Sequence, residues 1–213
     1  MATSDARIEA TDVLSLFPTF VWNIQLSSEF YEALNAEILK ALDRVRRGLP
    51  VTAHGEVWQS DKDLHKTGEL AGLVSFVGST TRRILRFLNI GYDAFEITGC
   101  WANIGAPRAS HIMHSHPNNY LSGVYYVRIH PGADTINFHD PRIQTGIIRP
   151  PVTELTSRNT DQVVIRVKNG TLLMFPAYLQ HSVDPNQSNQ ERISVSFNIM
   201  FSSFTEHLSK PLW

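Results

Sequence analysis

Three histidines have the types and spacing of a metal site. His114 and His116 lie two residues apart, and His181 follows much later in the chain. In an extended strand, residues two apart point to the same face, so the imidazoles of His114 and His116 are expected to converge on one point. His181 would reach that point from another strand. Such ligands suit Fe(II), Zn or Cu, and a site with open positions suits the oxygen chemistry of non-haem iron.

An arginine and a serine follow His181 along the chain. Turn-forming residues fill positions 184–190, so we expect a hairpin that brings Arg192 close to His181. A guanidinium pairs with a carboxylate through two parallel hydrogen bonds, and Ser194 shares its face of the strand. This pattern predicts a site that holds a dicarboxylic acid by one end while the other end reaches the metal.

Other residues in strand-like runs are candidates for the same cavity. Polar and large apolar side chains alternate over residues 192–201, which fits either a surface strand or a barrel strand that lines a cavity. Asn103 and Tyr126 are candidates for contact with a bound ligand. His111 has odd parity relative to His114, so it is expected to face away from the site.

Two helices and a set of short strands must position these residues. Apolar residues recur at helical spacing in 30–45 and 69–88, after one or two strands in 13–24. Beyond Gly91, β-prone runs separated by turn residues occur at 95–104, 120–129, 135–138, 162–167, 171–175 and 193–201. The predicted fold is mainly β with N-terminal helices, a jelly-roll barrel buttressed by two helices.

The length of 213 residues suits one domain. We expect a flexible tail over residues 1–12 and a single domain over 13–213. Within that domain, residues 13–91 are expected to form a helical buttress and residues 92–204 the barrel core.

Bulk composition argues against several classes of partner. The net charge is -1, from 19 Lys+Arg against 20 Asp+Glu, so there is no positive field for nucleic acid. The single cysteine, Cys100, excludes an internal disulfide. No apolar run is long enough for a signal peptide core or a membrane span. We therefore expect a cytoplasmic protein with no nucleic acid or membrane partner.

Taken together, the motifs resemble a known family. The pattern of His-x-His, a distal His and Arg-x-Ser is similar to that of the Fe(II)/2-oxoglutarate-dependent oxygenases, whose fold is a double-stranded β-helix. More narrowly, motifs between Leu16 and Phe201 resemble a group of these oxygenases in bacteria and phages. They include Leu16-Phe17-Pro18-Thr19, Trp58-Gln59-Ser60-Asp61, His114-Ser115-His116-Pro117, Phe138-His139-Asp140-Pro141-Arg142 and Phe175-Pro176.

The resemblance implies a cofactor set and a role for each candidate residue. Fe(II) would be held by His114, His116 and His181, and the cosubstrate 2-oxoglutarate would chelate the metal. Its far carboxylate would be held by Arg192 with Ser194 assisting, and further cosubstrate contacts are assigned to Asn103 and Tyr126.

Reaction with O₂ would then give succinate and CO₂, with oxidation, most commonly hydroxylation, of a small molecule, amino acid or peptide. No catalytic residue is expected beyond the metal site. The family motif is usually His-x-Asp, so Asp140 is retained as an alternative third ligand.

Two other functions stay open on the sequence. One is a three-His, cupin-like dioxygenase that needs no cosubstrate, for which Arg192 has no general use. The other is a non-catalytic, metal-binding jelly-roll module, which predicts a coordinatively closed site. Exposed edge strands in such barrels also favour a homodimer.

Overall fold

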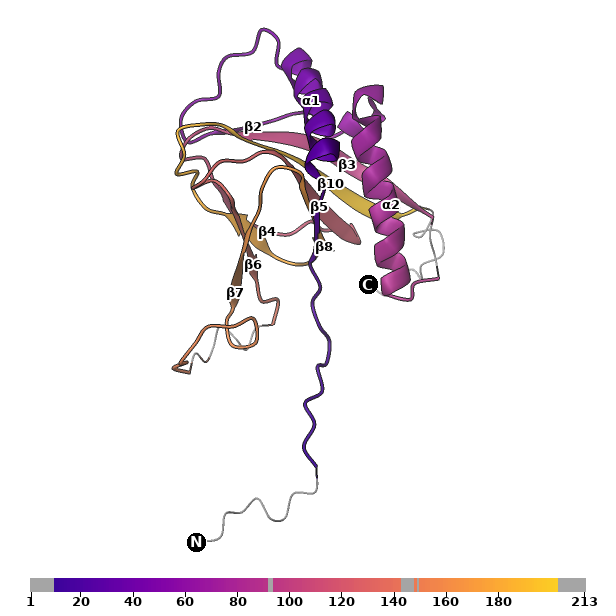
Figure 1. Cartoon of the computed structure of the whole chain (residues 1–213), viewed down its shortest axis with the longest axis vertical. Helices are drawn as coiled ribbons and strands as arrows, with labels where there is room; N and C mark the ends of the chain where they lie inside the picture. The colour runs from indigo at the N-terminus through magenta and orange to yellow at the C-terminus, as the bar shows by residue number, and fades with distance from the viewer. Residues whose placement is uncertain (1–9, 92–93, 143–147, 149, 203–213) are drawn as a thin grey trace, which may run out of the picture.

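Two antiparallel sheets lie face to face, and two helices cover the outer face of the larger one (Figure 1). The chain is described here by a computed structural model that covers residues 10–91, 94–142, 148 and 150–202. Its elements are β1 (Trp22–Gln25), α1 (Ser28–Val45), β2 (Val57–Gln59), α2 (Ala71–Phe87), β3 (Phe95–Gly105), β4 (His111–His114), β5 (Leu121–Arg128), β6 (Thr135–His139), β7 (Gln162–Arg166), β8 (Thr171–Pro176), β9 (His181–Val183) and β10 (Arg192–Phe201). Short 3-10 turns at Leu64–Lys66 and Gly68–Leu70 precede α2.

The larger sheet has the strand order β1-β8-β5-β10-β3-β2, and the smaller has the order β4-β9-β6-β7. Every pair of named strands is antiparallel. The expected mainly β jelly-roll barrel of the double-stranded β-helix type, with two buttressing helices, is confirmed.

Helix α1 is fixed to the larger sheet by an apolar stripe and one buried amide. Leu34, Ile38 and Leu42 recur at helical spacing and are buried in the core. Asn35 donates to the Val127 carbonyl at 2.8 Å and accepts from the Tyr125 hydroxyl at 2.8 Å. These bonds satisfy the amide inside the core and set the position of the helix over β5.

Strand β10 divides its side chains between two environments. Ile193, Val195, Phe197 and Ile199 belong to the core between the larger sheet and the helices. Arg192, Ser194 and Ser196 line a cavity between the two sheets. Of the two interpretations of this alternating strand, the structure supports the one in which its polar face lines a cavity.

Of the one or two strands expected in residues 13–24, the structure has one, β1, since the exposed segment before it has no partner strand and contains Pro18. The hairpin expected after His181 was wrong. Strands β9 and β10 form no hairpin, because they belong to different sheets. Residues 184–191 instead cross from one sheet to the other, which still leaves His181 and Arg192 lining the same cavity.

Cys100 is buried on β3, and burial raises the pKa of its thiol to about 12. None of the helices in the described part of the chain is long and apolar enough to cross a membrane. Residues 1–9 of the expected tail and 203–204 of the expected barrel lie outside the described residues. The proposed division of the chain at residue 91 stays a prediction.

Gly123, on β5, gives a direct test of the packing in the larger sheet. A β-carbon at this position would overlap the Phe197 ring and lie 2.8 Å from the Leu173 carbonyl oxygen. Gly123→Ala is therefore expected to lower the free energy of unfolding by about 1–3 kcal/mol, measured by chemical denaturation. Gly68→Ala, where a β-carbon meets nothing within 4 Å, is the control and should stay within about 0.5 kcal/mol of the wild type. Equal stability of both variants would contradict the described packing.

Candidate metal centre and cosubstrate cavity

The three predicted histidines converge at one end of the cavity. Each of His114, His116 and His181 offers one ligand atom, and these atoms all lie within 4.8 Å of one another. His114 and His181 are paired in register between β4 and β9, and their ring centroids are 4.4 Å apart. Three imidazoles at this separation can bind one transition-metal ion and leave coordination positions open.

His116 reaches the cluster by a different route from the one expected. Strand β4 ends at His114, so His116 does not share an extended strand with it. The backbone N–H of His116 donates to the Ala177 carbonyl at 2.9 Å, and a turn follows in which Asn118 has a φ of 63°. The simple alternation argument was therefore wrong, although the two rings do converge.

Backbone carbonyls orient two of the three rings. The Nδ1 atom of His114 is 2.7 Å from the Ile112 carbonyl oxygen, and that of His181 is 3.0 Å from the Leu179 oxygen. Because a carbonyl only accepts, each Nδ1 carries the proton and each Nε2 keeps its lone pair for a metal. Burial also lowers the pKa of His181 to about 3 and that of His116 to about 4. These rings are neutral at physiological pH, as metal ligation requires.

The histidines form one wall of a cavity of about 50 Å³, which has space for several water molecules. Its lining residues come from both sheets: Gln59, Trp101, Asn103, His111, His114, His116, Val124, Tyr126, Ile136, His181, Val183, Arg192, Ser194 and Ser196. The cavity therefore contains all four residues expected to bind the cosubstrate, together with the three histidines.

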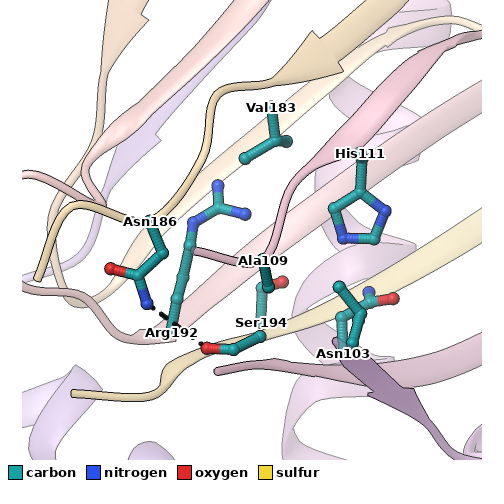
Figure 2. Close-up of a pocket in the computed structure, with 9 residues that line it drawn as sticks. Asn103, Ala109, His111, Val183, Asn186, Arg192 and Ser194 are labelled. Atoms are coloured by element: carbon teal, nitrogen blue, oxygen red, sulfur yellow. Dashed lines mark hydrogen bonds between the residues drawn. The ribbon is translucent and has the colours of Figure 1, made fainter. Parts of the chain in front are cut away.

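Arg192 is a buried cation in this cavity. It is 7% exposed, and burial lowers the pKa of its guanidinium. The guanidinium carbon lies 5.3 Å from the centroid of the Tyr126 ring, and one terminal nitrogen is 3.4 Å from the Thr135 carbonyl oxygen. Among the described residues, neither Arg192 Nε nor the Tyr126 hydroxyl makes a well-formed hydrogen bond. Figure 2 shows Arg192, Ser194 and Asn103 around one pocket with His111 and Val183.

A chain of amides and a hydroxyl forms the polar wall on the larger sheet. Gln59 donates to the Asn103 side-chain oxygen at 2.7 Å, and Asn103 donates to the Ser196 hydroxyl oxygen at 2.9 Å. The three residues come from the adjacent strands β2, β3 and β10. Sequence reasoning did not assign Gln59 to the site, because the stretch that contains the short strand β2 has no clear period. Ser196 lies on the polar face of residues 192–201, which the sequence offered as a possible cavity wall.

His111 also lines the cavity, contrary to the expectation that it faces away. Between β4 and β9 the partners are His111 with Val183 and His114 with His181, so three steps on one strand match two on the other. This bulge changes the parity and turns His111 to the same side as His114. The pKa of His111 is lowered to about 4, mainly by burial and in part by the nearby Arg192 guanidinium. His111 is not part of the three-His cluster.

Asp140, the alternative ligand, has other partners in the structure. Its two carboxylate oxygens accept hydrogen bonds from the Arg142 guanidinium at 2.9 and 2.7 Å. The metal-binding cluster that the described residues form contains no carboxylate.

A comparison with family models agrees with this geometry. Residues 99–198 match the model described as "Putative 2OG-Fe(II) oxygenase". This region runs from β3 into β10 and contains the three histidines, Arg192 and Ser194. Over this region the chain is similar to the 2-oxoglutarate/Fe(II)-dependent oxygenases. The resemblance seen in the sequence motifs is confirmed, and so is the enzyme class.

Several solved structures have a similar fold. SnoK, a non-haem, α-ketoglutarate-dependent carbocyclase from nogalamycin biosynthesis, has a TM-score of 0.61 at 15% identity, with 92% of this chain and 89% of that chain covered. HygX from Streptomyces hygroscopicus, solved with nickel and 2-oxoglutarate bound, has a TM-score of 0.59 at 14% identity, covering 87% and 84%. A prolyl-4-hydroxylase from Pseudomonas putida has a TM-score of 0.57 at 14% identity, covering 86% and 94%. At these identities the likeness shows the fold alone. No curated protein matches the sequence of this chain.

The geometry predicts which side chains the metal requires. His116→Ala is expected to weaken the binding of Fe(II), or of Co(II) as a substitute, by at least about ten-fold, because one of three ligands is lost. His111→Ala is the matched control, since His111 lines the same cavity outside the cluster. Isothermal titration calorimetry under anaerobic conditions measures both affinities.

A second variant tests the alternative ligand. Asp140→Asn should bind metal as the wild type does, because Asp140 pairs with Arg142 and lies outside the three-His cluster. Loss of metal binding in Asp140→Asn, with binding retained in His116→Ala, would identify the carboxylate as the third ligand.

Proposed function

We propose that this oxygenase binds Fe(II) through His114, His116 and His181 and uses 2-oxoglutarate and O₂ to oxidise a small molecule or peptide, most commonly by hydroxylation. The observation that carries the proposal is that a cluster of three imidazoles and the buried Arg192 line one cavity. The described residues that line this cavity include no aspartate or glutamate. A site that bound only a metal would have no need for a buried guanidinium at its other end.

The residues fit the cosubstrate at both of its ends. Burying a cation without an anion is costly, and Arg192 Nε is a buried donor with no well-formed bond to the described residues. The Tyr126 hydroxyl is a second such group. A carboxylate beside Arg192 would accept from both and from the Ser194 hydroxyl. At the opposite end, three neutral imidazoles suit a divalent metal of intermediate softness, such as Fe(II).

The metal and cosubstrate would supply the oxidation chemistry, whereas the protein binds and orients them. When bound, Fe(II) with 2-oxoglutarate and O₂ supplies the oxidising power and releases succinate and CO₂. The chain itself orients the three imidazoles through backbone carbonyls and anchors a carboxylate at Arg192. The apolar side chains of Val124, Ile136 and Val183 line the space between, and an apolar lining limits the entry of water once the cosubstrate is bound. Asn103, held between Gln59 and Ser196, keeps the polar wall rigid.

The remaining assignments follow from the same features. We assign the site no nucleic acid partner, because its lining is nearly uncharged and the whole chain has a net charge of -1. A prime substrate that is a small molecule or peptide is supported by the substrates named for similar folds, such as prolyl residues for the Pseudomonas putida enzyme. A cytoplasmic location is proposed from the single, buried cysteine. The open edges of β2 and β4 support a homodimer.

Anaerobic titration with Fe(II) and then 2-oxoglutarate tests the proposal. We expect a weak visible charge-transfer band from chelation of the keto acid, and 2-oxoglutarate-dependent formation of succinate in air. Arg192→Met should weaken 2-oxoglutarate binding at least about thirty-fold, or 2 kcal/mol, because a buried charge partner is lost. Arg128→Met, on the neighbouring strand but exposed, is the control and should leave binding unchanged.

Two results would contradict the proposal. Iron binding without the band would favour the cupin-like dioxygenase that uses no cosubstrate. Absence of any iron binding would favour a non-catalytic binding module.

A further inference from the structure

The cavity contains an unusual balance of charge. Its fourteen described lining residues include no aspartate or glutamate, and Arg192 is the only permanently charged side chain among them. His116 occupies the place where the usual two-His, one-carboxylate site has its acid. The protein therefore contributes positive charge to this cavity and no compensating negative charge.

The charges of the expected ligands do not cancel this excess. A divalent metal and Arg192 together carry three positive charges, and 2-oxoglutarate carries two negative ones. One positive charge remains, which a carboxylate ligand would neutralise in the usual site. In a partly buried cavity such a charge favours the binding of a further anion.

A second cation lies on the other side of the histidine cluster. Lys62 Nζ is 5.6 Å from the centroid of the Trp101 ring, and that ring is 6.0 Å from the His116 ring. Trp101 and His116 both line the cavity. Lys62 is exposed and forms no ion pair with any acid in the described part of the chain, including its neighbours Asp61 and Asp63.

The two cations lie near different histidines. Arg192 and His111 line the same pocket, which His116 does not reach. Lys62 lies over the Trp101 ring, whose neighbour in the cluster is His116. Arg192 therefore lies toward His111 and Lys62 toward His116, with the metal ligands between them. A dicarboxylic cosubstrate at Arg192 leaves Lys62 available for a different anion.

We propose that the prime substrate is a small carboxylate-bearing molecule whose carboxylate pairs with Lys62 beside Trp101, with its reacting carbon directed toward the histidine cluster. This inference rests on the function proposed above. It names Lys62 as the residue that selects anionic substrates, and it makes the missing carboxylate ligand part of that selection.

The test compares matched anionic and neutral probes on the loaded protein. Ni(II)-loaded oxygenase saturated with 2-oxoglutarate is titrated calorimetrically with N-acetylphenylalanine, N-acetylleucine and N-acetylproline, and with the carboxamide of each. At least one carboxylate is expected to bind about five-fold or more tightly than its amide. Lys62→Gln should remove that preference, and Lys62→Glu should reverse it. Lys40→Gln, an exposed lysine on α1, is the control and should keep it.

The outcomes separate this inference from the proposed function. Equal binding of carboxylates and amides, no binding of any carboxylate, or a preference that survives Lys62→Gln would overturn the inference while 2-oxoglutarate still binds. Failure of 2-oxoglutarate itself to bind the Ni(II)-loaded wild type would contradict the proposed function, and the inference would fail with it.

Discussion

The burial of the Arg192 guanidinium is the constraint on which the rest of this structure depends. A cation removed from water is stable only when its surroundings hold it firmly and offer compensating interactions. Strand β10, which carries it, is paired on both sides, with β3 and β5. The outer face of the same strand packs beneath the helices through Ile193 and Val195. The helices are therefore more than a cover, because they fix the strand that places the cation.

Much of this arrangement could be predicted from local patterns. The alternation along residues 192–201 contains both the core face and the cavity face of β10, and the helical periods of α1 and α2 follow from apolar spacing alone. Six strands follow from β-prone runs between turn residues. The joint occurrence of His114, His181 and Arg192 indicated the site, since each residue type is uncommon inside a barrel without a function. Such features depend only on neighbours in the sequence.

What could not be predicted depends on pairing between distant strands. The bulge between His111 and His114 exists only because β4 pairs with β9, and no local signal marks it. The hairpin expected after His181 is absent for a related reason, because β9 and β10 belong to different sheets. Gln59 lines the cavity because the short strand β2 pairs with β3. Parity arguments hold within one regular strand and fail where register or sheet membership changes.

Burial acts at both ends of the cavity. It is the main cause of the lowered pKa values of His111 and His181, and the Arg192 guanidinium adds to the effect at His111. Protonation of either ring would place a second positive charge in a cavity that contains no acid among its described residues. Burial therefore favours the neutral form of these imidazoles, and a neutral imidazole is the form that binds a metal. The Arg192 guanidinium adds to this effect only at His111, which lies outside the three-His cluster. The metal end and the cosubstrate end thus share one requirement, an enclosed space whose described lining contains no acid.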